Sequence, residues 1–182
     1  MNVDLIKKSP TIESEEFILR PLLDEHKSLV YSIVSNKTLR DRIQLDVLDE
    51  EHLFNQWWEL RMVALPAFKL MHWVVFLKEG NEFCGLLTLK EIDKNAKRGE
   101  IGYSFLPEFW GKGIGSKAVQ LVFDFAMKEV QFHSLFAQVL ELNKASQKIL
   151  QKMGFEKEGY FKDCHFHKGQ YFDILQYGVI NS

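Results

Sequence analysis

Cysteine, proline and long apolar runs are scarce in this chain of 182 residues. Its two cysteines, Cys84 and Cys164, lie far apart with no metal-like spacing, which favours reduced thiols in a cytoplasmic protein. No apolar run approaches the ~20 residues that a membrane-spanning helix needs, and no apolar signal region follows the first residues. We therefore expect neither a membrane segment nor a disulfide framework.

The chain also has no large excess of charge of one sign. Lys and Arg number 23 against 25 Asp and Glu, a net charge of −2, which gives no electrostatic footprint for nucleic acid. A positively charged substrate would not be repelled. Hydrophobic residues make up 46% and charged residues 26%, as in an ordinary globular protein. Repeats and linkers rich in Pro, Gly or Ser are missing, which predicts one domain over residues 1–182.

Periodicity predicts elements in the order β-α-α-β-β-β-α-β-α-β-β. Expected strands cover residues 16–21, 70–78, 82–91, 97–106, 135–140, 155–166 and 170–180, and expected helices cover 24–34, 49–64, 113–130 and 143–153. Asp24 is the expected cap of the first helix, and Leu53, Trp57, Leu60 and Ala64 are expected on one face of the second. Short connections between residues 70 and 106 predict antiparallel neighbours. The fold class is α/β (α+β): a mixed, mostly antiparallel sheet of about seven strands with helices on both faces.

Residues 110–116 read Trp-Gly-Lys-Gly-Ile-Gly-Ser, between an expected strand and an expected helix. Glycines at alternate positions allow backbone N–H groups to converge on a phosphate, and the helix dipole adds to the attraction. A Walker-type loop is excluded because Ser116 precedes Lys117. A dinucleotide site stays open, with Glu141 following the next strand, although its Gly-x-Gly-x-x-Gly spacing is not met. A glycine-rich turn without a ligand is the third interpretation.

Four motifs surround and follow this loop in order. They are Gly-Glu-Ile-Gly-Tyr at 99–103, Pro-Glu-Phe-Trp-Gly-Lys-Gly-Ile-Gly at 107–115, Asn-Lys-Ala-Ser at 143–146 and Lys-Met-Gly-Phe at 152–155. Together with Phe-Ile-Leu-Arg-Pro-Leu at 17–22, they resemble the GNAT superfamily of acetyl-CoA-dependent N-acetyltransferases. The resemblance is closest to the Rim-type subgroup, which acetylates N-terminal amines of ribosomal proteins and usually has Trp at the position of Trp110. It covers nearly the whole chain except residues 36–69.

The resemblance implies acetyl-CoA as cosubstrate, no metal, and a set of residues that hold the donor. The CoA pyrophosphate would bind the backbone N–H groups of Lys112, Gly113, Ile114, Gly115 and Ser116. The strand ending at Phe105 and Leu106 would splay from its neighbour after Phe136, so that the pantetheine arm pairs with the freed backbone. An N–H near Leu106 would hold the thioester oxygen. Asn143 would cap a helix and contact the pantetheine.

Two residues are the catalytic candidates. Glu100 is the candidate general base, and its alternative interpretation is an exposed carboxylate paired with Arg98 or Lys97. Ser146 is the candidate proton donor to the CoA thiolate, and its alternative is a serine that bonds locally to helix backbone. Many GNAT enzymes use a tyrosine one turn further on, where this chain has Leu150.

The acceptor is the part of the function that the sequence defines least. Tyr103 and Trp58 are the candidate substrate contacts, with a sheet-face or core role as the alternative for each. His165 and His167 alternate on a strand and favour a surface or cleft-edge pair over a metal site. The leading acceptor is a protein N-terminal α-amine, and the alternatives are a small amine (polyamine, amino acid or drug) or a non-catalytic CoA- or nucleotide-binding module. Relatives often form dimers, but no segment here identifies a homodimer interface.

Overall fold

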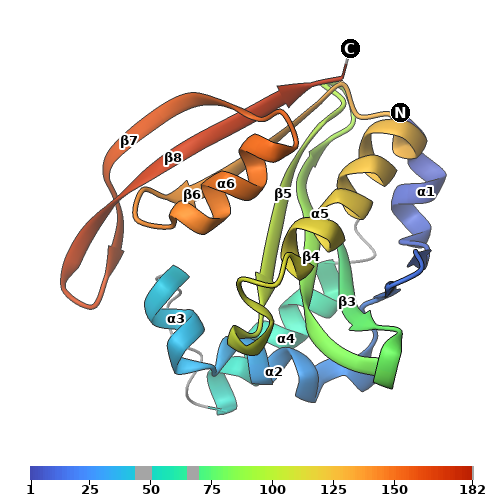
Figure 1. Ribbon diagram of the computed structural model, residues 1–182, viewed down its shortest axis with the longest axis horizontal. Coiled ribbons are helices and arrows are strands. Elements are labelled where there is room, and N and C mark those ends of the chain that lie inside the picture. The colour runs from blue at the N-terminus through green and yellow to red at the C-terminus, as the bar shows by residue number, and fades with distance from the viewer. Residues whose placement is uncertain (44–50, 65–69, 182) are drawn as a thin grey trace.

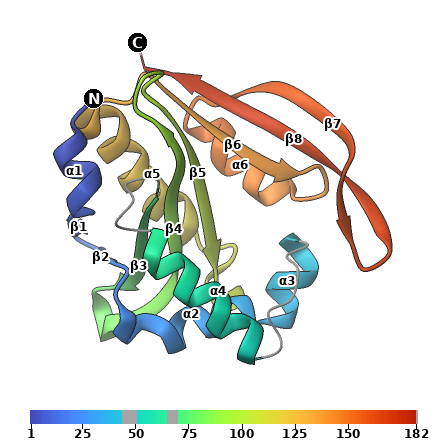
Figure 2. The ribbon, with the colours of Figure 1, turned by 180° about the vertical axis from the view of Figure 1, so that it is seen from behind.

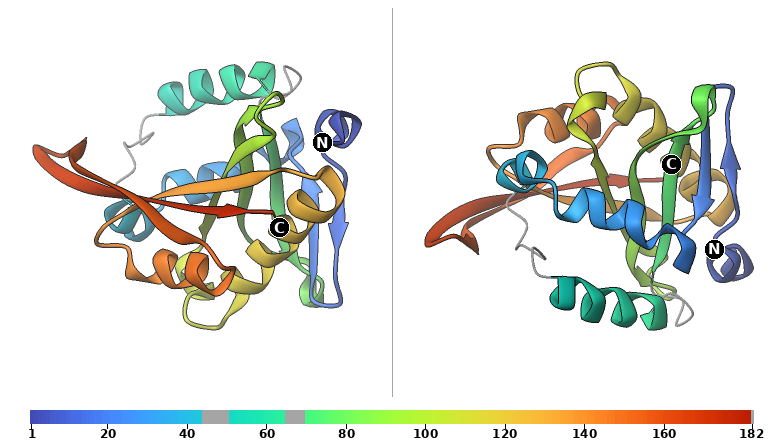
Figure 3. Two further views of the ribbon diagram at one scale, coloured as in Figure 1. Left: turned by 90° about the horizontal axis from the view of Figure 1, so that it is seen from above. Right: turned by 90° about the horizontal axis from the view of Figure 1, so that it is seen from below.

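The computed structural model describes residues 1–43, 51–64 and 70–181. Its centre is one sheet of eight strands in the order β1-β2-β3-β4-β5-β6-β8-β7, with helices on both faces (Figures 1 and 3). The strands are β1 (Ile12–Glu13), β2 (Phe17–Pro21), β3 (Met71–Leu77), β4 (Glu82–Asp93), β5 (Arg98–Phe105), β6 (Ser134–Leu140), β7 (Glu156–His167) and β8 (Gln170–Ile180). The helices are α1 (Val3–Lys8), α2 (Lys27–Val34), α3 (Lys37–Ile43), α4 (Glu51–Ala64), α5 (Ile114–Asp124) and α6 (Lys144–Lys152).

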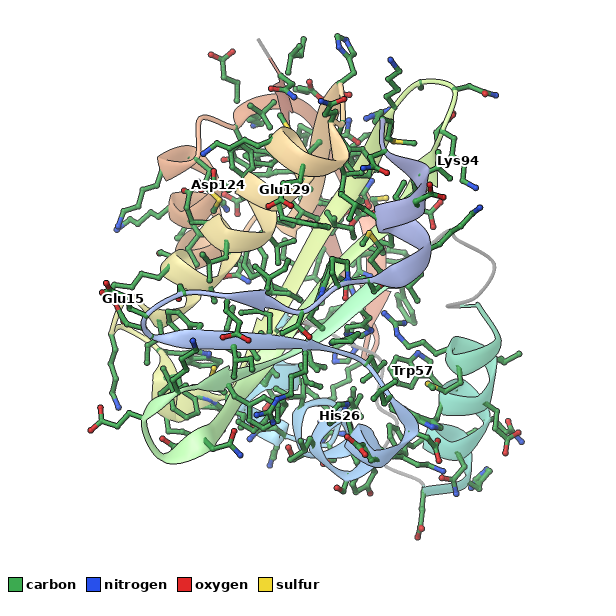
Figure 4. All side chains as sticks on the ribbon, turned by 90° about the vertical axis from the view of Figure 1, so that its right-hand side faces the viewer. Glu15, His26, Trp57, Lys94, Asp124 and Glu129 are labelled. Carbon is green, nitrogen blue, oxygen red and sulfur yellow. The ribbon has the colours of Figure 1, made fainter. Side chains whose placement is uncertain are left out.

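The expected antiparallel meander is confirmed, and so is the mixed sheet. Neighbours pair antiparallel throughout except β5 and β6, which run parallel. The eighth strand is the two-residue β1, which is too short to produce a period-2 pattern and was not expected from the sequence. The predicted helix over 113–130 is α5 followed by one π-helical segment, Phe125–Val130. Asp124 and Glu129, labelled in Figure 4, lie on its outer side.

Two apolar cores lie on opposite faces of the sheet. The larger packs α1, α5 and α6 against the sheet and includes Trp73, Leu89, Val122 and Leu150. The smaller packs α2, α3 and α4 against the other face. Figure 3 shows α2 and α4 on one side of the sheet and α5 and α6 on the other. Among the described residues, the larger core includes side chains of both β5 and β6, whereas the smaller core includes none from either strand.

Near the smaller core, the structure departs from the sequence-based expectations in α4 and at Asp24. In α4 the buried residues are Phe54 and Trp58, whereas Leu60 is 73% exposed, so the face that shares Leu53, Trp57 and Leu60 is not the one that packs into the core. Aromatic and apolar side chains occur around most of α4, so periodicity alone does not select its buried face. Asp24 does not cap α2; it begins a 3₁₀ turn and accepts a hydrogen bond from the indole of Trp58. The predicted helix start at residue 49 lies outside the described residues.

The parallel pair β5 and β6 is in contact over only three residues of each strand. Pairing runs from Arg98 with Ser134 to Glu100 with Phe136 and then stops, although both strands continue. The strands diverge in Figures 1 and 2, and the predicted splay after Phe136 is confirmed. Beyond the gap, the long β7–β8 hairpin extends outward, and Lys168 near its turn forms an ion pair of 2.9 Å with Asp41 of α3.

Candidate active site

The gap between β5 and β6 opens into two cavities that share part of their walls. A larger cavity of about 680 Å³ lies against the glycine loop and α6. A smaller cavity of about 260 Å³ lies between β5, β6 and the hairpin. Tyr103, Ser104, Asn143 and Ser146 line both. Two molecules that enter from opposite sides would therefore meet at these four residues.

The glycine loop forms one end of the larger cavity. Gly113 has φ +79° and is the N-cap of α5, and Gly111 has φ +74°. This left-handed backbone is unfavourable for other L-residues. Because Gly113 provides no capping side chain, the first-turn N–H groups of α5 are left to bind an anion at the positive end of the helix dipole. Lys148 and Lys152 of α6 line the same cavity and add positive charge.

The structure brings together part of the predicted donor site. The larger cavity is lined by Phe105, Gly113, Gly115, Ser116 and Asn143, whereas Leu106, Lys112 and Ile114 do not line it. The Leu106 N–H donates to the carbonyl oxygen of Cys84 at 3.0 Å, so it is not available to a thioester. Because neighbouring residues of a strand point their N–H groups to opposite sides, the Phe105 N–H faces the gap instead. The N–H expected to hold the thioester oxygen is therefore that of Phe105 and not that of Leu106.

Glu100 is buried, contrary to the alternative interpretation of an exposed carboxylate. Its side chain is 11% exposed, and its Oε1 lies 3.0 Å from Nζ of Lys90. Lys90 stands directly opposite Glu100 in the β4–β5 register, whereas the Arg98 guanidinium lies over the Phe136 ring. Lys90 was missed as a partner because only the strand register, not sequence proximity, brings it to Glu100. The pair lies in the wall of the smaller cavity.

Ser146 and Tyr103 are hydrogen-bonded where the two cavities meet. Their hydroxyl oxygens lie 2.8 Å apart, and the Tyr103 hydroxyl also lies 3.2 Å from the Ser146 carbonyl oxygen. Burial raises the pKa of Tyr103, so its hydroxyl stays protonated. Asn143 caps α6 as predicted, with its Oδ1 accepting from the Ser146 N–H at 3.2 Å. The cap sets Ser146 in the first turn of α6 with its hydroxyl toward β5.

The histidine pair and Trp58 are divided between the smaller cavity and the interior of the protein. His165 lines the smaller cavity, and its ring lies nearly parallel to that of the buried His167, 6.3 Å away. Trp58 lies in the smaller core at 2% exposure and lines neither cavity. Trp57, labelled in Figure 4, stacks on Phe54 and on the Arg61 guanidinium.

A buried basic pair lies on the same sheet face as Glu100. Arg61 of α4 donates its Nε–H to Nδ1 of His72 on β3 at 3.0 Å. Burial and the neighbouring Arg61 charge hold the pKa of His72 well below its usual value, and burial lowers the pKa of Arg61 to about 10. His72 therefore packs as a neutral ring.

Across the described ranges 1–43, 51–64 and 70–181, no group of three or more His, Cys, Asp or Glu side chains is placed to hold a metal ion. Among the helices that the structure describes, none has the length and apolar character needed to cross a bilayer.

Comparison with known proteins gives consistent matches. The model of the acetyltransferase (GNAT) domain matches residues 16–156. The uncharacterized N-acetyltransferase YoaA of Bacillus subtilis is 23% identical over 171 residues, which cover 94% of this chain and 97% of that protein. The [ribosomal protein uS5]-alanine N-acetyltransferase of Escherichia coli is 26% identical over 132 residues, 70% of this chain and 68% of its own. The crystal structure of spermidine N-acetyltransferase from Vibrio cholerae with CoA and spermine has a TM-score of 0.83 at 19% identity, covering 92% and 97% of the two chains.

Proposed function

Because the chain belongs to the GNAT acetyltransferase family and is an acetyl-CoA-dependent N-acetyltransferase, we propose that its acceptor is a protein N-terminal α-amine. The family excludes the dinucleotide alternative for the glycine loop. One relative, the uS5 enzyme, is named for acetylating the alanine of a ribosomal protein. The observation that carries the proposal is the charge balance of the smaller cavity, where Lys90 pairs with Glu100.

Acetyl-CoA occupies the larger cavity in this proposal. Its pyrophosphate binds the N–H groups at the start of α5, and Lys148 and Lys152 lie where they balance phosphate charge. The pantetheine arm extends along the edge of β5 that β6 leaves unpaired beyond Glu100. This path leads the thioester to Phe105, Tyr103 and Ser146, where the two cavities join.

The reaction is attack of a neutral amine on the thioester carbon. The C–N bond forms as the C–S bond breaks, and the Phe105 N–H stabilises the charge that develops on the carbonyl oxygen. The amine proton passes to Glu100 and from there to solvent. The departing thiolate takes a proton from the Ser146 hydroxyl, which lines both cavities and regains its proton from solvent. An α-amine, with a pKa of ~7.7–8.0, becomes neutral at a cost of about 1 kcal/mol at pH 7, whereas a lysine costs several. An α-amine therefore makes the smaller demand on Glu100.

The smaller cavity favours an acceptor with a single positive charge. Among its described lining residues, Glu100 is the sole carboxylate, and Lys90 already balances it at 3.0 Å. A polyamine carries several positive charges and needs several carboxylates to offset their desolvation. A peptide N-terminus carries one ammonium followed by neutral amides, which suits the polar wall that Ser104 and Gln138 contribute. This charge balance separates the proposal from the small polyamine alternative.

Competing acceptors test the proposal. We would compare a tetrapeptide that begins with alanine, the same peptide with a blocked N-terminus and an added lysine, and spermidine, following release of the CoA thiol. We expect transfer to the free α-amine, confirmed by mass, and at least about 10-fold lower kcat/KM for the other two acceptors. Faster turnover of spermidine would contradict the peptide assignment. Gly113→Trp, which fills the anion site, serves as the donor-binding control.

A further inference from the structure

Trp110 connects the glycine loop to the strand that faces the thioester. Its indole Nε1–H donates to the carbonyl oxygen of Phe105 at 2.7 Å, five residues earlier in the chain. Trp110 is half-buried and packs against both apolar cores. The side chain therefore joins the start of the loop, the end of β5 and the two sides of the sheet at one point.

The indole fixes one end of a peptide group whose other end is also held. The Phe105 carbonyl and the Leu106 N–H belong to the same planar peptide unit. Trp110 binds its carbonyl at 2.7 Å, and the Cys84 carbonyl binds its N–H at 3.0 Å, from the opposite side. A peptide held on both edges cannot rotate about the strand axis without losing one of these hydrogen bonds.

Close packing of its side chain also restricts Phe105, in addition to the two backbone hydrogen bonds. A Cβ added at Gly85 would lie 2.5 Å from the Phe105 ring, so only glycine leaves room for it there. A Cβ added at Gly115, in the loop, would lie 3.3 Å from the other edge of the ring. The ring, 6% exposed at the residue level, thus packs between β4 and the loop.

These contacts determine what the edge of β5 offers to a ligand. The N–H and C=O of Phe105 both point toward the gap, because Leu106 points toward β4. Trp110 occupies the carbonyl, which leaves the N–H as the Phe105 group that faces the cavity. An arriving pantetheine chain consequently stops pairing at this residue, where its thioester oxygen meets the N–H.

We infer that Trp110 is a positioning residue that holds the Phe105 N–H in place for the thioester oxygen. The inference rests on the proposed role of the Phe105 N–H in the transfer reaction. The indole does not contact the reacting atoms. It holds the Phe105–Leu106 peptide and so fixes the Cα of Phe105, which is also one end of the Ser104–Phe105 peptide that carries the Phe105 N–H. Stabilisation of a developing oxyanion depends steeply on the position of the N–H that binds it. A looser peptide at Phe105 should therefore lower kcat more than it lowers the affinity for acetyl-CoA.

Trp110→Phe tests the inference because it keeps an aromatic ring and removes the N–H donor, together with part of the ring volume that Trp73→Phe also removes. We expect kcat to fall about 10-fold, as for a misplaced rather than a deleted oxyanion donor, while the Kd for CoA changes less than about 2-fold. Trp73→Phe is the matched control, because the buried Trp73 indole also donates to a carbonyl, that of Pro10 at 2.8 Å, and lines neither cavity. It should leave both constants unchanged.

Equal losses of kcat and CoA affinity in Trp110→Phe would overturn the inference and indicate a general packing role. An unchanged kcat would overturn it as well. Absence of transfer to every acceptor in the unmodified protein would instead contradict the proposed function, so the two failures are distinguishable.

A second measurement needs no variant and covers the case in which Trp110→Phe does not fold. In ¹⁵N-labelled protein, the Phe105 amide resonance should shift further on binding acetyl-CoA than on binding CoA, which has no thioester oxygen. The Trp110 indole N–H should stay protected from exchange in both complexes. Identical Phe105 shifts, or rapid exchange of that indole proton, would contradict the inference.

Discussion

The phenolic oxygen of Tyr103 lies 2.8 Å from the hydroxyl oxygen of Ser146, although 43 residues separate them in the chain. The bond crosses from β5 to α6 where the larger and smaller cavities meet. Because burial raises the pKa of Tyr103, its proton stays on the phenol and can be donated to the serine oxygen. In that arrangement the Ser146 hydroxyl proton is directed to the departing thiolate.

A double-mutant cycle tests this relationship. Ser146→Ala should lower kcat by about 100-fold, the lower end for a positioned proton donor. Tyr103→Phe should lower it about 5-fold, the equivalent of one net hydrogen bond. The double variant should be no slower than Ser146→Ala, because Tyr103 acts through the serine. Multiplicative losses would show independent roles, and Tyr177→Phe, a buried tyrosine outside both cavities, serves as the control.

Glu100→Gln should produce a pH-dependent loss of activity. At pH 6.5 we expect kcat/KM to fall by about 100-fold, because a protonated α-amine needs a base. At pH 9 the α-amine is already neutral, so the loss should shrink to about 3-fold. Full profiles from pH 6 to 9.5 measure the difference. Lys90→Gln, which keeps the Glu100 carboxylate and removes its partner, should retain the shape of the normal pH profile. A loss of kcat/KM in Glu100→Gln that is equal at every pH would contradict the assignment of Glu100 as the base.

Gly113→Ala and Gly80→Ala form a matched pair. Both glycines have positive φ, +79° and +72°, and an added Cβ meets no atom within 4 Å at either position. Each substitution should cost about 1 kcal/mol of stability, a Tm decrease of about 2–4 °C. Gly113→Ala alone should weaken acetyl-CoA binding, by about 10-fold, because Gly113 lines the larger cavity whereas Gly80 lies in the β3–β4 turn. Titration calorimetry measures the Kd for acetyl-CoA, and thermal melts measure the Tm. Equal acetyl-CoA affinities in Gly113→Ala and Gly80→Ala would argue against a phosphate site at Gly113.

His72 should make stability depend on pH on the acid side. Its folded-state pKa lies well below the ordinary ~6.5, so the unfolded chain takes up a proton first as pH falls. Its contribution to stability is therefore complete above about pH 6.5 and is lost below it, by at most about 1.4 kcal/mol per pH unit. Urea unfolding at pH 7, 6 and 5 should show a shallower decline in His72→Gln. His26, whose pKa is lowered in the same direction, remains in both proteins and provides the common background.

Local patterns in the sequence determined much of the fold. Alternation over residues 70–106, with short turns between the runs, gave the meander β3-β4-β5, because such turns join antiparallel neighbours. The glycines at 111 and 113 and the helix after them predicted the loop that the proposal assigns to a phosphate, because positive φ and unpaired first-turn N–H groups are local properties. Asn143 was identified as a helix cap for the same reason.

Only the tertiary structure decided which residues act together. The strand register, not sequence proximity, gave Glu100 the partner Lys90, with Glu100 buried and Lys90 partly exposed in the wall of the smaller cavity. The packing of α4 selected Phe54 and Trp58 as its buried side, so Trp58 lies in the smaller core and lines neither cavity. Pairing with Cys84 occupied the Leu106 N–H and left that of Phe105 to face the gap. Contacts between distant segments depend on how strands and helices pack, and the sequence encodes that packing only through all its residues at once.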